Sequence, residues 1–137
     1  MTRSISRWVW LWLGASLGVA ACGSQPLMEL QRVRSGKLDV VLLSPRDAIT
    51  HGKDAFTIEF RSASDGALVD VGDVRAGSAS MTMSGTPMFG GFEITRTSVV
   101  GRFQASTDLG MAGLWRLTVD WAGPAGQGSA TFSGNVR

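Results

Sequence analysis

Hydrophobic and polar residues alternate along the chain from about residue 37 onward, in short stretches that are separated by glycine-containing turns. The clearest stretch is 114–121, in which Trp115, Leu117, Val119 and Trp121 occupy every second position. A period of two is typical of a β-strand with one buried face. We therefore predict that these four side chains belong to a hydrophobic core. No stretch keeps a helical period over three turns.

The same reading predicts a series of strands over 38–43, 55–60, 68–74, 80–83, 92–100, 102–107, 114–121 and 129–136. Turn signals separate them, with a loop expected at 84–87 and a hairpin turn at 100–101. Short strands at regular spacing are typical of a sandwich of two sheets. We predict an all-β fold, a single immunoglobulin-like antiparallel β-sandwich of about seven strands over residues 37–137.

The first two dozen residues have a different pattern. Arg3 and Arg7 precede an apolar run over 8–17, which is followed by small residues and then Val19-Ala20-Ala21-Cys22. This arrangement resembles a bacterial lipoprotein signal peptide with its lipobox. The resemblance implies that residues 1–21 are removed and that Cys22 becomes the lipid attachment site. An uncleaved N-terminal anchor is the alternative, although the small residues at 18–23 interrupt the apolar run.

A lipidated Cys22 would place the protein in the bacterial cell envelope, anchored to the membrane through its lipid. Residues 22–36 are interpreted as the lipidated cysteine and a tether, with a strand added to the sheet as the alternative. Gly23 stands where an aspartate would favour the inner membrane. In a diderm host we therefore expect the outer membrane, on the periplasmic side.

Charge and cysteine content narrow the function classes. Arg3 and Arg7 account for the whole formal charge of +2, so the chain after residue 21 is electrically balanced. Only Arg32, Arg34 and Lys37 form a basic cluster there, which argues against a nucleic-acid partner. The single cysteine leaves no disulfide, so the domain must rely on its hydrophobic core.

Several motifs between His51 and Trp121 resemble the YtkA-like domain, a family of small immunoglobulin-like modules of bacterial envelope proteins related to the FixH-like proteins. The segments that carry the resemblance are 52–58, 65–69, Met81-x-Met83 with Pro87-Met88, 101–103 and 111–119. The family implies the fold, and some relatives sit beside copper or other heavy-metal systems or cytochrome oxidase assembly. The family's compact Met-Pro-x-Met followed by glycine and histidine is stretched here and lacks the histidine.

The methionines are the candidate metal ligands of this chain. Met81, Met83, Met88 and Met111 supply soft thioether sulfurs, and three of these can hold Cu(I) without cysteine or histidine. We expect them to converge at one end of the sandwich. Methionines also fill gaps in hydrophobic cores, so simple packing is the alternative.

The sequence offers few residues for catalysis or for phosphate binding. His51 lies beside Gly52 at an expected turn, and one histidine allows no convincing catalytic triad. Asp65, Asp70 and Asp73 are interpreted as strand-end charges, and the glycine-rich segments as turns. We therefore expect no enzyme but a binding module, engaged in metal handling or cofactor assembly. The alternative is a structural or adaptor domain that docks an envelope partner protein.

Overall fold

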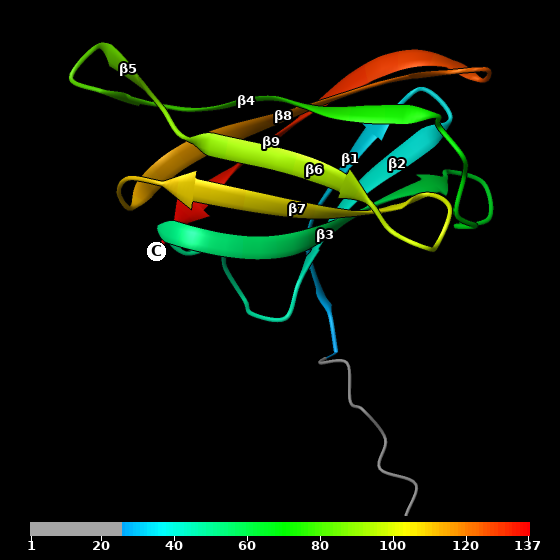
Figure 1. Cartoon of the computed structure of the whole chain (residues 1–137), viewed down its shortest axis with the longest axis horizontal. Helices are drawn as coiled ribbons and strands as arrows, with labels where there is room; N and C mark the ends of the chain where they lie inside the picture. The colour runs from blue at the N-terminus through cyan, green and yellow to red at the C-terminus, as the bar shows by residue number, and fades with distance from the viewer. Residues whose placement is uncertain (1–25) are drawn as a thin grey trace, which may run out of the picture.

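The structure, a computed structural model, describes residues 26–137, so the signal peptide expected at 1–21 and the lipid site expected at Cys22 lie outside the described residues. The described chain contains nine strands and no helix (Figure 1). They are β1 (Met28–Ser35), β2 (Leu38–Ser44), β3 (Gly52–Ser62), β4 (Asp73–Met83), β5 (Thr86–Phe89), β6 (Gly91–Arg96), β7 (Arg102–Leu109), β8 (Gly113–Gly123) and β9 (Gly126–Val136).

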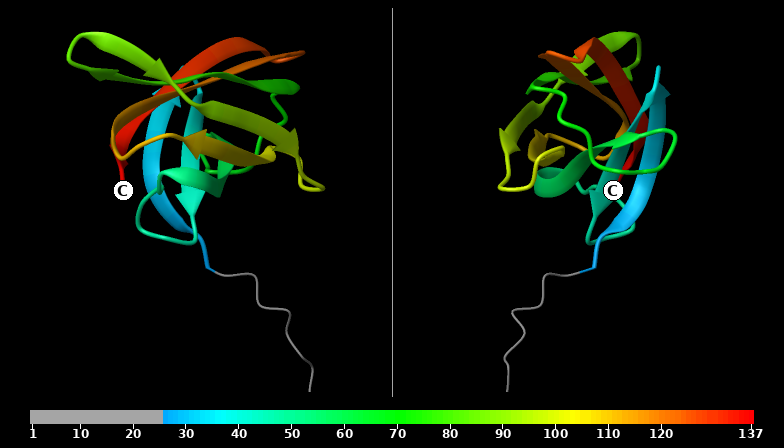
Figure 2. Two further views of the ribbon diagram at one scale, coloured as in Figure 1. Left: turned by 60° about the vertical axis from the view of Figure 1, so that its left-hand side comes forward. Right: turned by 90° about the vertical axis from the view of Figure 1, so that its right-hand side faces the viewer.

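The strands form two antiparallel sheets that pack face to face (Figure 2). One sheet has five strands in the order β1-β2-β3-β7-β6, and the other has four in the order β5-β4-β8-β9. The predicted all-β antiparallel sandwich is confirmed, with nine strands among residues 26–137 in place of about seven. Nowhere between residues 26 and 137 does the chain form a helix with the length and apolarity needed to cross a membrane.

The core lies between the sheets, where inward-facing residues of β3, β7, β8 and β9 meet. The prediction for Trp115, Leu117, Val119 and Trp121 is confirmed, because each is at most 6% exposed. Phe60 of β3 contacts Trp121 edge to face, with ring centroids 5.2 Å apart, so an aromatic contact joins the two sheets.

The outer face of the five-stranded sheet is more buried than the alternating pattern predicts. Thr57 and Glu59 of β3 are buried although they point away from the core. Arg61 donates a hydrogen bond to Glu59 at 3.0 Å, and Arg102 of the neighbouring β7 lies 3.7 Å from the same carboxylate. Long arginine side chains therefore cover the middle of this sheet.

The strand boundaries differ most from the prediction at β1, β4, β5 and β6, whereas β3 and β9 each begin three residues earlier than expected. For Met28–Ser35 the alternative of an added strand is confirmed in place of the tether, because these residues form β1 and pair along β2, so the sandwich begins before the expected residue 37. The strands expected at 68–74 and 80–83 are replaced by the single strand β4. β5 begins within the loop expected at 84–87, and β6 ends at Arg96 instead of Val100.

Candidate functional site

Three of the four candidate methionines lie on one hairpin, formed by β4 and β5. This hairpin extends past the rest of its sheet at one end of the sandwich, at the upper left of Figure 1. Met81 of β4 lies directly opposite Met88 of β5. Side chains of directly opposed residues share a face, and so do residues two apart on one strand. Met81, Met83 and Met88 therefore all point from the same face of the hairpin.

The three side chains differ in burial in a graded way. Met81 is 8% exposed and belongs to the hydrophobic core, whereas Met83 is 44% and Met88 37% exposed. The face is therefore continuous from the core of the sandwich to its rim. A ligand that approaches from solvent reaches Met83 and Met88 first and Met81 last.

Met111 approaches the same place from the turn between β7 and β8, which lies at the same end of the molecule in Figures 1 and 2. A β-carbon at Gly113 would lie 2.8 Å from Cε of Met81 and 4.0 Å from its sulfur. The thioether of Met81 thus rests on the start of β8, two residues after Met111. The indole of Trp115 donates a hydrogen bond of 2.9 Å to the Met111 carbonyl, which fixes the turn.

The chemistry that these methionines offer is that of ligands for a soft metal ion. Thioether sulfurs favour Cu(I), and three of them complete a trigonal site. They carry no proton between pH 4 and 10, so such a site would be insensitive to pH, unlike one built from histidine or carboxylate. Among the described residues, no group of three or more His, Cys, Asp and Glu side chains is placed to hold a metal ion.

The remaining candidates lie elsewhere. His51 is exposed, and its Nδ1 lies 2.9 Å from the carbonyl oxygen of Arg137, a contact that ties the last residue to the β2–β3 loop. Asp65 and Asp70 accept hydrogen bonds from nearby backbone amides, and Asp73 pairs with Arg96 at 2.7 Å. These carboxylates hold turns and strand ends, as the sequence predicted.

Sequence reasoning missed the surroundings of the methionines. Phe89 is 74% and Leu114 57% exposed. Their register partners, Ser80 and Asn135, face away from the core, so both side chains lie on the outer face of the four-stranded sheet beside the hairpin. The available signal was the Pro87-Met88-Phe89 sequence, which reads as a short apolar edge strand once 84–85 is recognised as a two-residue turn.

Comparison with known proteins gives one match. The model of the family described as YtkA-like matches residues 32–120, which is more than half of the chain. The match includes β2 to β7, the second half of β1 and most of β8. Neither the curated proteins nor the solved structures contain a match.

Proposed function

This chain belongs to the YtkA-like family, and from that premise we propose that it is a lipid-anchored binding module of the bacterial envelope that holds Cu(I) on its methionines. Cys22 carries the anchor in this proposal, and the module faces the periplasm from the outer membrane in a diderm host. It acts by binding, in metal handling or oxidase assembly, and not by catalysis.

One observation carries the copper proposal: Met81 and Met88 are directly opposed across β4 and β5, with Met83 on the same face. The β-carbons of directly opposed residues lie about 4.5–5.5 Å apart, so flexible thioethers at these positions reach a common point. Methionines that only filled the core would be buried, yet Met83 and Met88 are open to solvent.

We would test this with an anaerobic Cu(I) competition titration of the full chain in detergent. The double variant Met83→Leu/Met88→Leu keeps the apolar volume but removes two sulfurs. We expect it to bind Cu(I) at least tenfold more weakly than the unmodified chain, at pH 5 and at pH 8 alike. Met28→Leu is the matched control, because Met28 is also 44% exposed but lies on β1. Unchanged affinity in the double variant would refute the site.

A second function is favoured by the exposed Phe89 and Leu114, which give this end of the sandwich an apolar outer surface. In that case the module docks an envelope partner protein, and the methionines pack. A photoreactive residue at position 89 would then cross-link one partner in cells, whereas one at the exposed Val100 at the other end would not. Cu(I) binding by the purified chain would be absent.

A further inference from the structure

The two sheets are connected in different ways along the two long sides of the sandwich. On one side the chain itself crosses between the sheets, and the amide of Gly90 donates a 3.0 Å hydrogen bond to the Ala79 carbonyl. On the other side the edge strands β1 and β9 face each other. There the Gln31 side-chain oxygen accepts a 3.1 Å hydrogen bond from the Ser133 amide. We call this second side the β1–β9 seam.

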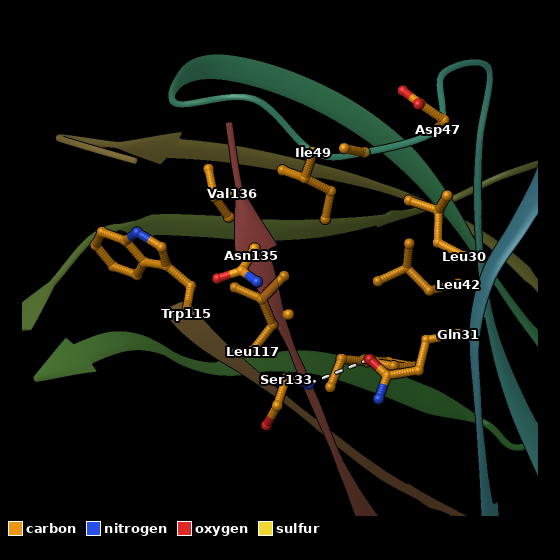
Figure 3. Close-up of a pocket in the computed structure, with 13 residues that line it drawn as sticks. Leu30, Gln31, Leu42, Asp47, Ile49, Trp115, Leu117, Ser133, Asn135 and Val136 are labelled. Carbon is orange, nitrogen blue, oxygen red and sulfur yellow. Dashed lines mark hydrogen bonds between the residues drawn. The ribbon is translucent and has the colours of Figure 1, made fainter. Parts of the chain in front are cut away.

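A cavity of about 330 Å³ opens along the β1–β9 seam (Figure 3). Its wall is apolar, supplied by side chains from both sheets and the β2–β3 loop: Leu30, Leu42, Ile49, Trp115, Leu117 and Phe132. Polar residues, among them Gln31, Asp47 and Asn135, also border it. The space equals the volume of about ten waters, and it is open to solvent where the exposed Asp47, Ser133 and Gly134 border it.

Gly134 explains why the space exists. Inward-facing positions on β9 alternate as Ala130, Phe132, Gly134 and Val136, so a side chain is missing from the core face at position 134. A β-carbon placed there would meet no heavy atom within 4 Å. The gap in the alternation therefore opens directly into the cavity.

We propose that this cavity binds an acyl chain, with the hydrocarbon inside and its carbonyl end at the seam. This proposal is independent of the copper site. The single donor of Trp115 is already committed to the Met111 carbonyl, so the ring adds only apolar surface. Asp47, the charged residue of the lining, is paired with Arg137 at 3.1 Å. The side-chain nitrogen of Gln31 can donate a hydrogen bond to a carbonyl or carboxyl oxygen at the seam, while its oxygen accepts from the Ser133 amide.

An added peptide strand fits this seam less well than a hydrocarbon chain does. Near the cavity, β9 already has backbone partners: Ser133 donates to Gln31, Arg137 donates to the Ile49 carbonyl, and the Arg137 carbonyl accepts from His51. A new strand would have to break these bonds. An acyl chain needs only the apolar space between them.

Photoaffinity labelling of the full chain tests the proposal in two arms. The first uses a free sixteen-carbon fatty acid with a mid-chain diazirine, added to protein in a glycosidic detergent. The second uses phosphatidylcholine that carries the same chain, in bilayer discs. Peptide mass spectrometry then locates the label. We expect it on the segments that contain Leu30, Leu42 and Phe132. Labelling in the first arm alone assigns a free fatty acid, and labelling in the second alone assigns a membrane lipid.

Gly134→Leu fills the cavity and should reduce labelling of these segments at least fivefold. Gly110→Leu is the matched control, because a β-carbon at Gly110 also meets no atom within 4 Å, but in the β7–β8 turn. Leu30→Trp, which fills the cavity from β1, should repeat the loss if Gly134→Leu does not fold. Absence of label from these segments in both arms, or equal labelling in a folded cavity-filled variant, would overturn the proposal.

Discussion

At the scale of single residues, three inward-facing glycines of the β8–β9 pair have three different surroundings. A β-carbon at Gly128 would lie 2.4 Å from the Trp121 ring, and one at Gly113 would lie 2.8 Å from Met81 Cε. These two glycines make room for a large neighbouring side chain. Gly134 has no such neighbour. Trp121 is the register partner of Gly128 across the β8–β9 hairpin, whereas Met81 comes from a distant position in the chain, so no single local pattern separates the three cases.

The open space at Gly134 predicts a stabilising substitution. Gly134→Leu should raise the free energy of unfolding by about 1–2 kcal/mol, because leucine buries apolar area and a side chain reduces the freedom of the unfolded chain. Thermal and urea denaturation would measure the change. Gly110→Leu shares the effect on the unfolded chain but buries nothing, so it should gain less. A loss of stability in Gly134→Leu would mean that the cavity cannot accept a side chain.

At the scale of elements, the sequence predicted strands best where the apolar residues run without a break, as in β2, or alternate regularly with polar ones. β8 and β7 meet the second condition and were placed to within two residues. The sequence left β1 undecided between a tether and a strand, because its outer face carries Arg32 and Arg34, which are also typical of a solvated tether. In the structure both guanidinium groups bond to the buried Asp39 of β2, at 3.1 and 2.9 Å. This pairing joins two strands, so a local pattern could not show it.

For the candidate methionine site as well, the sequence could predict one part of the arrangement and not the rest. Residue type and spacing identified the four methionines, and Met81 and Met83 were correctly expected on one face of a strand. The facing position of Met88 depended on the two-residue turn at 84–85, which the sequence reading extended to 87. The contact of Met81 with Gly113 depends on tertiary packing, so sequence reasoning had no means to reach it.

The hydrogen bond between Gln31 and the Ser133 amide across the β1–β9 seam leads to a prediction about contact between strands. Gln31→Leu removes the acceptor of the Ser133 amide, a bond worth about 0.5–1.5 kcal/mol. We expect hydrogen exchange at the Ser133 amide to accelerate up to about tenfold, while amides of β3 keep their protection. Gln104→Leu, an exposed site on β7, is the matched control and should leave Ser133 unchanged. Equal exchange in all three proteins would show that Gln31 does not hold the seam.

At the scale of the whole molecule, carboxylates connect segments that the hydrophobic core leaves loose. A hydrogen bond from Arg34, together with Arg32, holds the pKa of Asp39 below its usual range despite the cost of burial. Arg32 likewise lowers the pKa of Glu29. The ion pairs of Arg32 and Arg34 with Asp39 join β1 to β2, whereas the Glu29–Arg32 pair lies within β1. At the other end of β2, Asp54 accepts hydrogen bonds from the amides of Thr50 and Ala55 and from Arg46, which orders the β2–β3 loop.

Asp54 makes the sharpest test of this arrangement. Burial alone would raise its pKa, but the amides of Thr50 and Ala55 and the Arg46 guanidinium together hold the pKa below the usual value of 3.8. A carboxylate with a lowered pKa in the folded state stabilises above its unfolded pKa and loses that contribution as the pH falls through the folded value.

Thermal unfolding from pH 7 down to pH 2 should therefore show a steady Tm down to about pH 4.5 and a decline below it, as Glu29, Asp39 and Asp54 take up protons. Asp54→Asn should cost about 1–3 kcal/mol at pH 7, because the amide replaces a buried charge acceptor. Since asparagine does not titrate, the gap between the two proteins should narrow as the pH falls below 4. A gap that stays constant over this range would show that the ionised Asp54 contributes nothing to stability.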